Sequence, residues 1–263
     1  MKKIIYFLFI LQIATSFAQE VKLKATRLDS IGVKADFFVG FDGFNNCIYL
    51  KNNVLFKKID QSIIQYQNLG LGKITKVDIT NPLKIIIFYE EFNSVIVLDN
   101  QLNEIQKIEF SRLEQPVLAS AIGISGQNKL WVFNSLSQQI GLYDLTTGIY
   151  ENKSNPLNQP IAFYQTDFNY FHWIDKDKIW YTATIFGRII TNGNVEVSSD
   201  LLLLPQNKIL FSKDNKLFIR DRNINKLYEI EIVEKTFKKF YYKEQILSIF
   251  TNQGITNYKI IIP

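Results

Sequence analysis

The sequence contains very few of the residue types on which enzyme and metal sites most often depend. Among its 263 residues there is one Cys, one His and one Met. A single Cys excludes an internal disulfide, so a chain of this size must rest on a hydrophobic core. A single His excludes metal sites built on several imidazoles. The motifs HExxH, GxSxG and CxxC and the phosphate-binding glycine loop are also absent.

Residues that break regular structure are sparse as well. The 12 Gly and 6 Pro are scattered, so they mark no linker and no low-complexity segment. No window of 11 or more residues carries a clear apolar stripe with the period of a helix. Short apolar runs rich in β-branched and aromatic residues fill the chain instead, which predicts a nearly all-β protein. Cys47 lies in such a run, and we expect it to be a small buried hydrophobic residue rather than a reactive thiol.

The first residues have the pattern of a secretory signal peptide. Lys2 and Lys3 precede a mostly apolar run over residues 4–13, and small residues occupy positions 16 and 18. The run is much shorter than the roughly 20 residues that a membrane-spanning helix needs. We therefore expect residues 1–18 to be a signal peptide and residues 19–263 to fold as one domain. The prediction is an exported protein of the periplasm or cell surface that does not span a membrane.

The charge of the chain is mildly positive. Thirty basic and 25 acidic residues give +5, and loss of Lys2 and Lys3 leaves 28 against 25, or +3. Basic and acidic residues are interleaved, which does not suggest a nucleic-acid partner. The densest basic cluster, "KTFKKFYYK" over residues 235–243, alternates apolar and charged residues as an exposed strand does.

One unit of sequence recurs along the chain. It is an apolar strand followed by a short loop rich in Asn, Asp and Ser and by a second strand with alternating polarity, as in a hairpin. The first strands of these units start at Cys47, Ile85, Leu130, Ile179, Leu217 and Ile255. The intervals between these starts are 38, 45, 49, 38 and 38 residues. A further short apolar piece precedes most of them, so each repeat holds three or four strands.

A repeat of about 40 residues with four short strands is typical of a β-propeller. One blade cannot cover its own apolar faces, whereas a ring of blades buries them between neighbours. Six first strands predict six blades, although the two longer intervals leave rings of five or seven blades open. The last repeat lacks a final strand, and residues Val21–Asp29 offer a spare one. We predict that this segment closes the ring as the outer strand of the last blade.

Two turns carry a family resemblance. In "LYDLTTG" (residues 142–148) and "VLDNQLNEIQKI" (residues 97–108), an Asp ends one strand and Gly or Asn leads into the next. With the signal sequence, these turns resemble secreted β-propeller proteins of Bacteroidetes-type bacteria that have degenerate blades of the NHL or WD40-like type. The WD dipeptide itself does not occur. The resemblance implies a periplasmic or cell-surface location and an interaction role, and it implies no reaction.

Aromatic residues crowd the region from 164 to 181. Large aromatic side chains most often pack as core between propeller sheets, but Tyr and Trp also serve as interface anchors and sugar-stacking platforms. Alternation predicts that Tyr170 and His172 lie on one face of a strand and Trp173 on the other. The candidate residues for binding a ligand or partner are Tyr164, Tyr170, His172, Trp173, Trp180 and Tyr181.

Candidates for catalysis or metal binding are weaker. His172 has no second ligand or nucleophile at an informative spacing, so a packing or hydrogen-bonding role is expected. Acids near the expected starts of inner strands could supply hard oxygen ligands to a divalent cation, but they do not recur at one blade position and are expected to cap turns. These acids are Asp42, Asp78, Asp167 and Asp200. We predict no catalytic residue, no metal and no cofactor.

The sequence therefore favours a non-enzymatic interaction scaffold of the bacterial cell envelope or surface, which binds a partner protein through propeller loops. A glycan or small-ligand binder that uses the aromatic group is the first alternative. A metal-dependent hydrolase or lyase at the central channel is the second. An interaction protein is expected to show an apolar or aromatic patch on one face of the ring.

Overall fold

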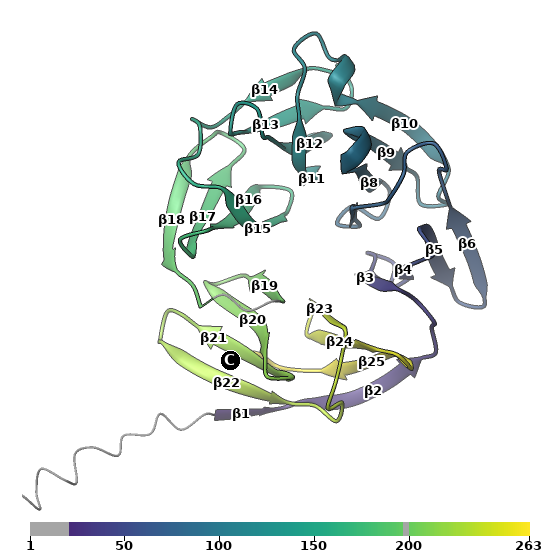
Figure 1. Cartoon of the computed structure of the whole chain (residues 1–263). Helices are drawn as coiled ribbons and strands as arrows, with labels where there is room; N and C mark the ends of the chain where they lie inside the picture. Colours follow the sequence, from purple (N-terminus) through teal and green to yellow (C-terminus); the bar gives the residue numbers. More distant parts are fainter. Residues whose placement is uncertain (1–20, 197–199) are drawn as a thin grey trace, which may run out of the picture.

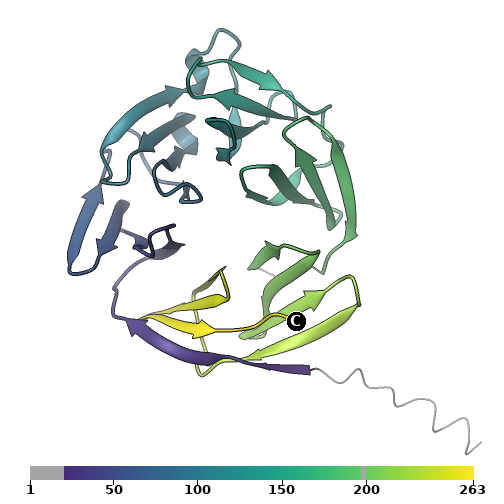
Figure 2. The ribbon, with the colours of Figure 1, turned by 180° about the vertical axis from the view of Figure 1, so that it is seen from behind.

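The computed structural model describes residues 21–196 and 200–263, which form six small sheets arranged in a ring (Figure 1). The predicted signal peptide, residues 1–18, lies outside the described residues. The view from behind shows the same closed ring around a central channel (Figure 2). The prediction of a six-bladed β-propeller is thus confirmed. Within the described parts of the chain, no helix is long and apolar enough to cross a membrane.

The first three blades each have four antiparallel strands, numbered from the channel outward. Blade 1 contains β3 (Phe37–Phe41), β4 (Cys47–Lys51), β5 (Val54–Ile59) and β6 (Ser62–Tyr66). Blade 2 contains β7 (Lys76–Asp78), β8 (Ile85–Tyr89), β9 (Ser94–Leu98) and β10 (Glu104–Glu109). Blade 3 contains β11 (Ala119–Ser125), β12 (Lys129–Asn134), β13 (Gln139–Asp144) and β14 (Tyr150–Asn152). Two short 3₁₀ helices, η2 (Glu90–Phe92) and η3 (Phe110–Arg112), lie between strands of this half.

The other three blades repeat the plan and include the N-terminal strands. Blade 4 contains β15 (Ile161–Thr166), β16 (Tyr170–Asp175), β17 (Ile179–Thr184) and β18 (Ile189–Asn194). Blade 5 contains β19 (Leu201–Leu204), β20 (Lys208–Lys213), β21 (Lys216–Asp221) and β22 (Lys226–Glu231), with β1 (Val21–Lys24) outside them. Blade 6 contains β23 (Lys239–Lys243), β24 (Ile246–Thr251), β25 (Gly254–Lys259) and, outermost, β2 (Thr26–Ile31).

The true repeat is more regular than the sequence suggested. The second strands start at residues 47, 85, 129, 170, 208 and 246, so the intervals are 38, 44, 41, 38 and 38 residues. The strands taken as equivalent from the sequence are second strands in blades 1 to 3 but third strands in blades 4 to 6. That equivalence was wrong, because second and third strands are both buried on two faces and look alike in composition. The shift produced the 49-residue interval and hid β20.

The N-terminal segment closes the ring as predicted, and it does so with two strands instead of one. β2 pairs antiparallel with β25 and completes blade 6. Beyond Ala25, β1 pairs in parallel with β22 as a fifth strand of blade 5. Asn257 Nδ2 adds a 2.7 Å hydrogen bond to Asp29 Oδ1. One segment therefore joins the last two blades along their outer edges.

The core consists of apolar layers between adjacent blades. Ile48 and Leu55 of blade 1 pack with Ile85 and Ile87 of blade 2, and each neighbouring pair of sheets is filled in the same way. Cys47 is buried, and burial raises the pKa of its thiol to about 12. It is a packed hydrophobic residue, as expected.

A buried ion pair lies in the layer between blades 1 and 2. Lys57 Nζ is 2.9 Å from Asp42 Oδ2, and the two side chains are 1% and 0% exposed. Lys57 also donates to the backbone oxygen of Asn100 in blade 2 at 2.8 Å. Burial alone would raise the pKa of Asp42, but the contact with Lys57 and hydrogen bonds from Asn46 and Phe44 lower it overall. The carboxylate is thus charged and fully satisfied inside the protein.

Candidate functional site

The alternating faces of β16 decide where the predicted site residues lie. Phe171 and Trp173 point toward blade 3 and join a cluster with Trp131. Tyr170 and His172 occupy the alternate positions, on the same face as Ile174, which packs with residues of blade 5. The predicted separation of Tyr170 and His172 from Trp173 is confirmed.

The six predicted residues do not share one surface. Trp173 stacks on Tyr181, with ring centroids 5.1 Å apart, and Tyr164 packs in the same layer between blades 3 and 4. Trp180 lies in the layer between blades 4 and 5. Both tryptophans are under 5% exposed, whereas Tyr170 is 41% exposed. Most of this aromatic group is therefore core, and Tyr170 is its most accessible ring.

Tyr164 holds three blades together near the channel. Its hydroxyl lies 3.3 Å from the backbone nitrogen of Ile122 in blade 3, and its ring stacks on Phe171. The ammonium of Lys76, from β7 of blade 2, lies 4.9 Å from the centre of the same ring. Burial raises the pKa of Tyr164 to about 12, so the phenol stays neutral at physiological pH.

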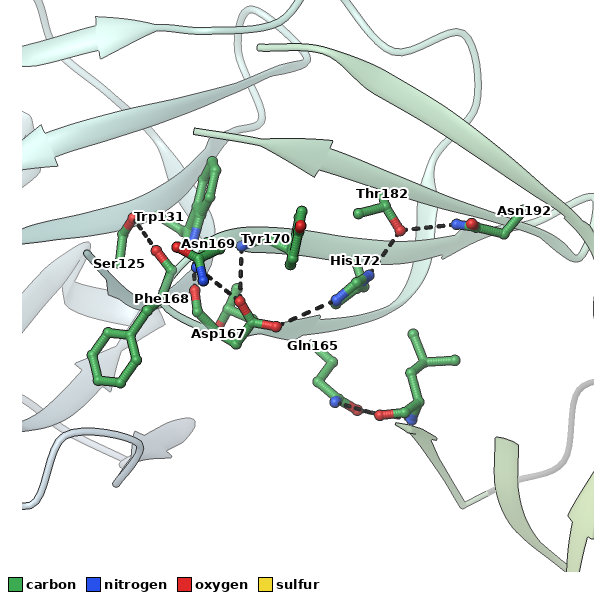
Figure 3. Close-up of polar contacts among 12 residues, drawn as sticks. Ser125, Trp131, Gln165, Asp167, Phe168, Asn169, Tyr170, His172, Thr182 and Asn192 are labelled. Carbon is green, nitrogen blue, oxygen red and sulfur yellow. Dashed lines mark hydrogen bonds and ion pairs between the residues drawn. The ribbon is translucent and has the colours of Figure 1, made fainter. Parts of the chain in front are cut away.

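A row of polar side chains crosses blade 4 and contains His172 (Figure 3). Asp167 Oδ2 lies 3.5 Å from His172 Nε2, and His172 Nδ1 lies 2.8 Å from Thr182 Oγ1. Asn192 Nδ2 donates to the same hydroxyl at 2.8 Å. Strand register accounts for part of the row, since His172 is the direct cross-strand partner of Thr182. A bulge in the pairing of β17 with β18 accompanies the approach of Asn192.

Asp167 anchors one end of this row by capping the turn between β15 and β16. Its Oδ1 accepts from the backbone nitrogens of Asn169 and Tyr170 at 2.8 and 2.9 Å. Burial raises the pKa of Asp167, but hydrogen bonds from His172 and the two backbone groups lower it overall. Its backbone oxygen accepts from Trp131 Nε1 of blade 3 at 2.9 Å, so the turn is tied to its neighbour (Figure 3).

A carboxylate, an imidazole and a hydroxyl in series resemble the arrangement that activates a nucleophile. Here the hydroxyl of Thr182 is buried within the sheet and already contacts both His172 and Asn192. Both ring nitrogens of His172 are engaged by neighbours. The row is therefore suited to fixing the orientation of β16 against β17, which is the packing and hydrogen-bonding role expected for His172.

Removing the central hydroxyl of this row tests that role. Thr182→Val keeps the shape but leaves His172 Nδ1 and Asn192 Nδ2 without their partner, so we expect a loss of about 1–3 kcal/mol in unfolding free energy. Thr191→Val is the matched control, because Thr191 is exposed on β18, opposite Tyr181. Urea unfolding of both variants measures the difference. Equal stabilities would show that the row contributes nothing.

The four acids considered as metal ligands lie in separate local contacts. Asp42 and Asp167 cap turns, and Asp78 accepts from Thr80 and from Ile124 of blade 3. Asp200 pairs with Lys239 at 3.3 Å. Across residues 21–196 and 200–263, no group of three or more His, Cys, Asp or Glu side chains is placed to hold a metal ion.

Exposed apolar side chains occupy the innermost turns at one end of the ring. Antiparallel pairing puts the turn between first and second strands at the same end of a blade as the turn between third and fourth strands. At this end Phe44, Leu83 and Phe168 are 56%, 58% and 40% exposed, on the inner turns of blades 1, 2 and 4. We call these three residues the inner-turn surface. Nothing in the sequence marked them, because each is one apolar residue within a polar turn.

Comparison with known proteins adds information about the fold. No protein-family profile matches the chain, and a search of curated proteins finds no match. A catalytically inactive histidine-to-alanine variant of virginiamycin B lyase from Staphylococcus aureus, solved with quinupristin, is similar with a TM-score of 0.58. The identity is 11%, over 94% of this chain and 97% of that chain.

Two further solved structures are similar over most of the chain. BamB from Moraxella catarrhalis gives a TM-score of 0.53 at 15% identity, over 89% of this chain and 99% of that one. A structural genomics protein of unknown function from Bacteroides thetaiotaomicron gives 0.57 at 13% identity, over 93% and 74%. At such identities the likeness shows the β-propeller fold alone.

Proposed function

We propose that this protein is a non-enzymatic interaction scaffold of the bacterial cell envelope or surface, exported to the periplasm or beyond. It binds a partner protein through the inner-turn surface. The observation that carries the proposal is the exposure of Phe44, Leu83 and Phe168 on neighbouring turns of a rigid ring. Exposed apolar groups clustered at one end of a soluble fold are typical of partner-binding surfaces.

The turns that carry these side chains are held in place by contacts between blades. Phe168 O accepts from the backbone nitrogen of Gly126 in blade 3 at 2.7 Å and from Ser125 Oγ at 3.3 Å (Figure 3). A pocket of about 300 Å³ lies beside Phe168, between the turns of blades 2, 3 and 4. Such preformed turns lose little freedom on binding, which favours recognition.

The charges around this surface indicate the chemistry of the partner. Lys84 Nζ contacts the side-chain oxygen of Asn128, and Lys243 Nζ donates to the backbone oxygen of Asp42 at 3.0 Å. Neither ammonium has a carboxylate within ion-pair distance among the residues that the structure describes. A partner that presents apolar side chains flanked by Asp or Glu would complement both features.

Comparison of variants at the two ends of the ring tests the proposal. The exported protein, tagged and crosslinked mildly in its own envelope, is expected to capture one partner in a fixed ratio. Combined Phe44→Ser, Leu83→Ser and Phe168→Ser is expected to reduce that capture at least tenfold, since buried apolar anchors dominate such interfaces. The control combines Leu69→Ser, Leu136→Ser and Val233→Ser, exposed residues in connections at the other end.

The control variant is expected to capture the partner as well as the wild type does. No partner at all, or equal capture by both triple variants, would refute binding through the inner-turn surface. Circular dichroism of each variant confirms that the fold is retained.

A further inference from the structure

A second, chemically different pocket lies between blades 4 and 5. It has a volume of about 510 Å³ and is lined by residues of β18, β20 and β21 and of the adjoining turns. This volume falls within the usual range for small-molecule sites. None of the six aromatic-region candidates lines it. We call it the Arg222 pocket, after the residue at the turn that follows β21.

Arg222 is held rigidly by neutral groups. Its Nη1 donates to Asn207 Oδ1 at 2.8 Å, and its Nη2 donates to the backbone oxygens of Asn192 and Asn194 at 2.6 and 3.1 Å. The guanidinium also lies 5.4 Å from the ring centre of Trp180. A guanidinium has five N–H donors, so two remain without an acceptor in the described chain. The cation is preorganised and still able to bind.

The positive charge of Arg222 is not neutralised by a carboxylate. Its four contacts are to amide oxygens and an indole ring. The other cation of the pocket, Arg220, lies 3.6 Å from Glu196, whose side chain is 80% exposed and therefore a weak partner. The pocket keeps an excess of one positive charge, which favours a ligand with a single negative charge.

The remaining lining favours hydroxyl groups and a carbon ring. The side-chain amides of Asn194 and Asn225 line the pocket, are exposed, and have no hydrogen-bond partner within the described residues. Each amide offers both donors and an acceptor, which suits sugar hydroxyls. Ile209 and Phe211 supply an apolar wall. Inorganic phosphate would use the guanidinium but neither the apolar wall nor the amide acceptors.

We propose that the Arg222 pocket binds a sugar acid, with the carboxylate on Arg222 and the hydroxyls on Asn194 and Asn225. The pocket is also connected to the polar row of blade 4, because Asn192 accepts from Arg222 and donates to Thr182. The site lies apart from the inner-turn surface and does not depend on the partner protein.

Titration of the whole folded domain with sodium D-glucuronate tests this site. In ¹H–¹⁵N NMR spectra at low salt, the side-chain amide signals of Asn194 and Asn225 are expected to shift and saturate. D-glucose, the uncharged counterpart, is expected to leave them in place. Arg222→Gln is expected to weaken glucuronate binding about tenfold or more, since a charged hydrogen bond is lost.

A matched pair of charge variants keeps the test valid if Arg222→Gln fails to fold. Asn225→Asp puts a negative charge in the pocket and is expected to weaken binding about fivefold. Asn215→Asp makes the same change at another turn position with positive φ, outside the pocket, and is expected to bind as the wild type does. Equal affinities of these two variants, equal shifts with glucose, equal saturation by phosphate, or no saturable shift would each overturn the proposal.

Discussion

Replacing Lys57 by methionine is expected to lower the free energy of unfolding by about 3–5 kcal/mol. The substitution keeps most of the side-chain volume but leaves Asp42 as an uncompensated charge in a site with no solvent access. It also removes the hydrogen bond from Lys57 to blade 2. Chemical denaturation at neutral pH measures the loss, which is a large part of the roughly 5–15 kcal/mol that stabilises a typical domain.

Two companion variants separate the buried charge from general effects of the substitution. Adding Asp42→Asn to Lys57→Met removes the unpaired charge and is expected to recover a large part of the lost stability. Lys216→Met breaks a 3.0 Å pair with Glu229, but Lys216 is 55% exposed, so the expected loss is below about 1 kcal/mol. A loss for Lys57→Met no larger than that of Lys216→Met would contradict the argument.

Deleting residues 21–31 is expected to open the ring. Most side chains of β2 are exposed, so the loss comes from the edge of β25 and not from apolar burial. At about 1 kcal/mol for each ladder hydrogen bond, the lost pairing of β2 alone amounts to several kcal/mol. The bare edge of β25 is then free to pair with other chains. Size-exclusion chromatography and thermal unfolding are expected to show association and a lower midpoint.

The shorter deletion of residues 21–24 is the control for this experiment. It removes only β1, the fifth strand of a blade that already has four, so the ring remains closed. We expect a monomer with a slightly lower midpoint. A monomeric, cooperatively unfolding chain after deletion of residues 21–31 would show that the N-terminal strands do not close the ring.

The repeat made most of the fold predictable from the sequence. Alternation and hairpin loops located the strand pairs, and the missing last strand pointed to Val21–Asp29 as the closing segment. The break at Ala25 was not predictable, since "VKLKATRLD" reads as one continuous strand. Register errors arose where two adjacent strands were equally apolar, as with β20 and β21. Composition cannot rank two strands that are buried alike.

The functional residues were harder to predict, because their roles depend on contacts between distant residues. Trp180 read as a possible binding platform, yet its ring supports Arg222, 42 positions later. Lys57 read as an exposed position and is one of the most buried side chains. Phe44 and Leu83 gave no signal, since exposure of a single apolar residue in a turn depends on the neighbouring blade. His172 was correctly expected to make structural hydrogen bonds.

The strands made first in this protein are the last to acquire partners. β2 pairs with β25, more than 220 residues away along the chain, and β1 pairs with β22, about 200 residues away. Long-range pairing of this kind slows folding, and synthesis delivers the partners only at its end. A chain cut short before blade 6 keeps an unpaired N-terminal segment that proteases can reach. The same segment that seals the ring therefore distinguishes complete chains from incomplete ones.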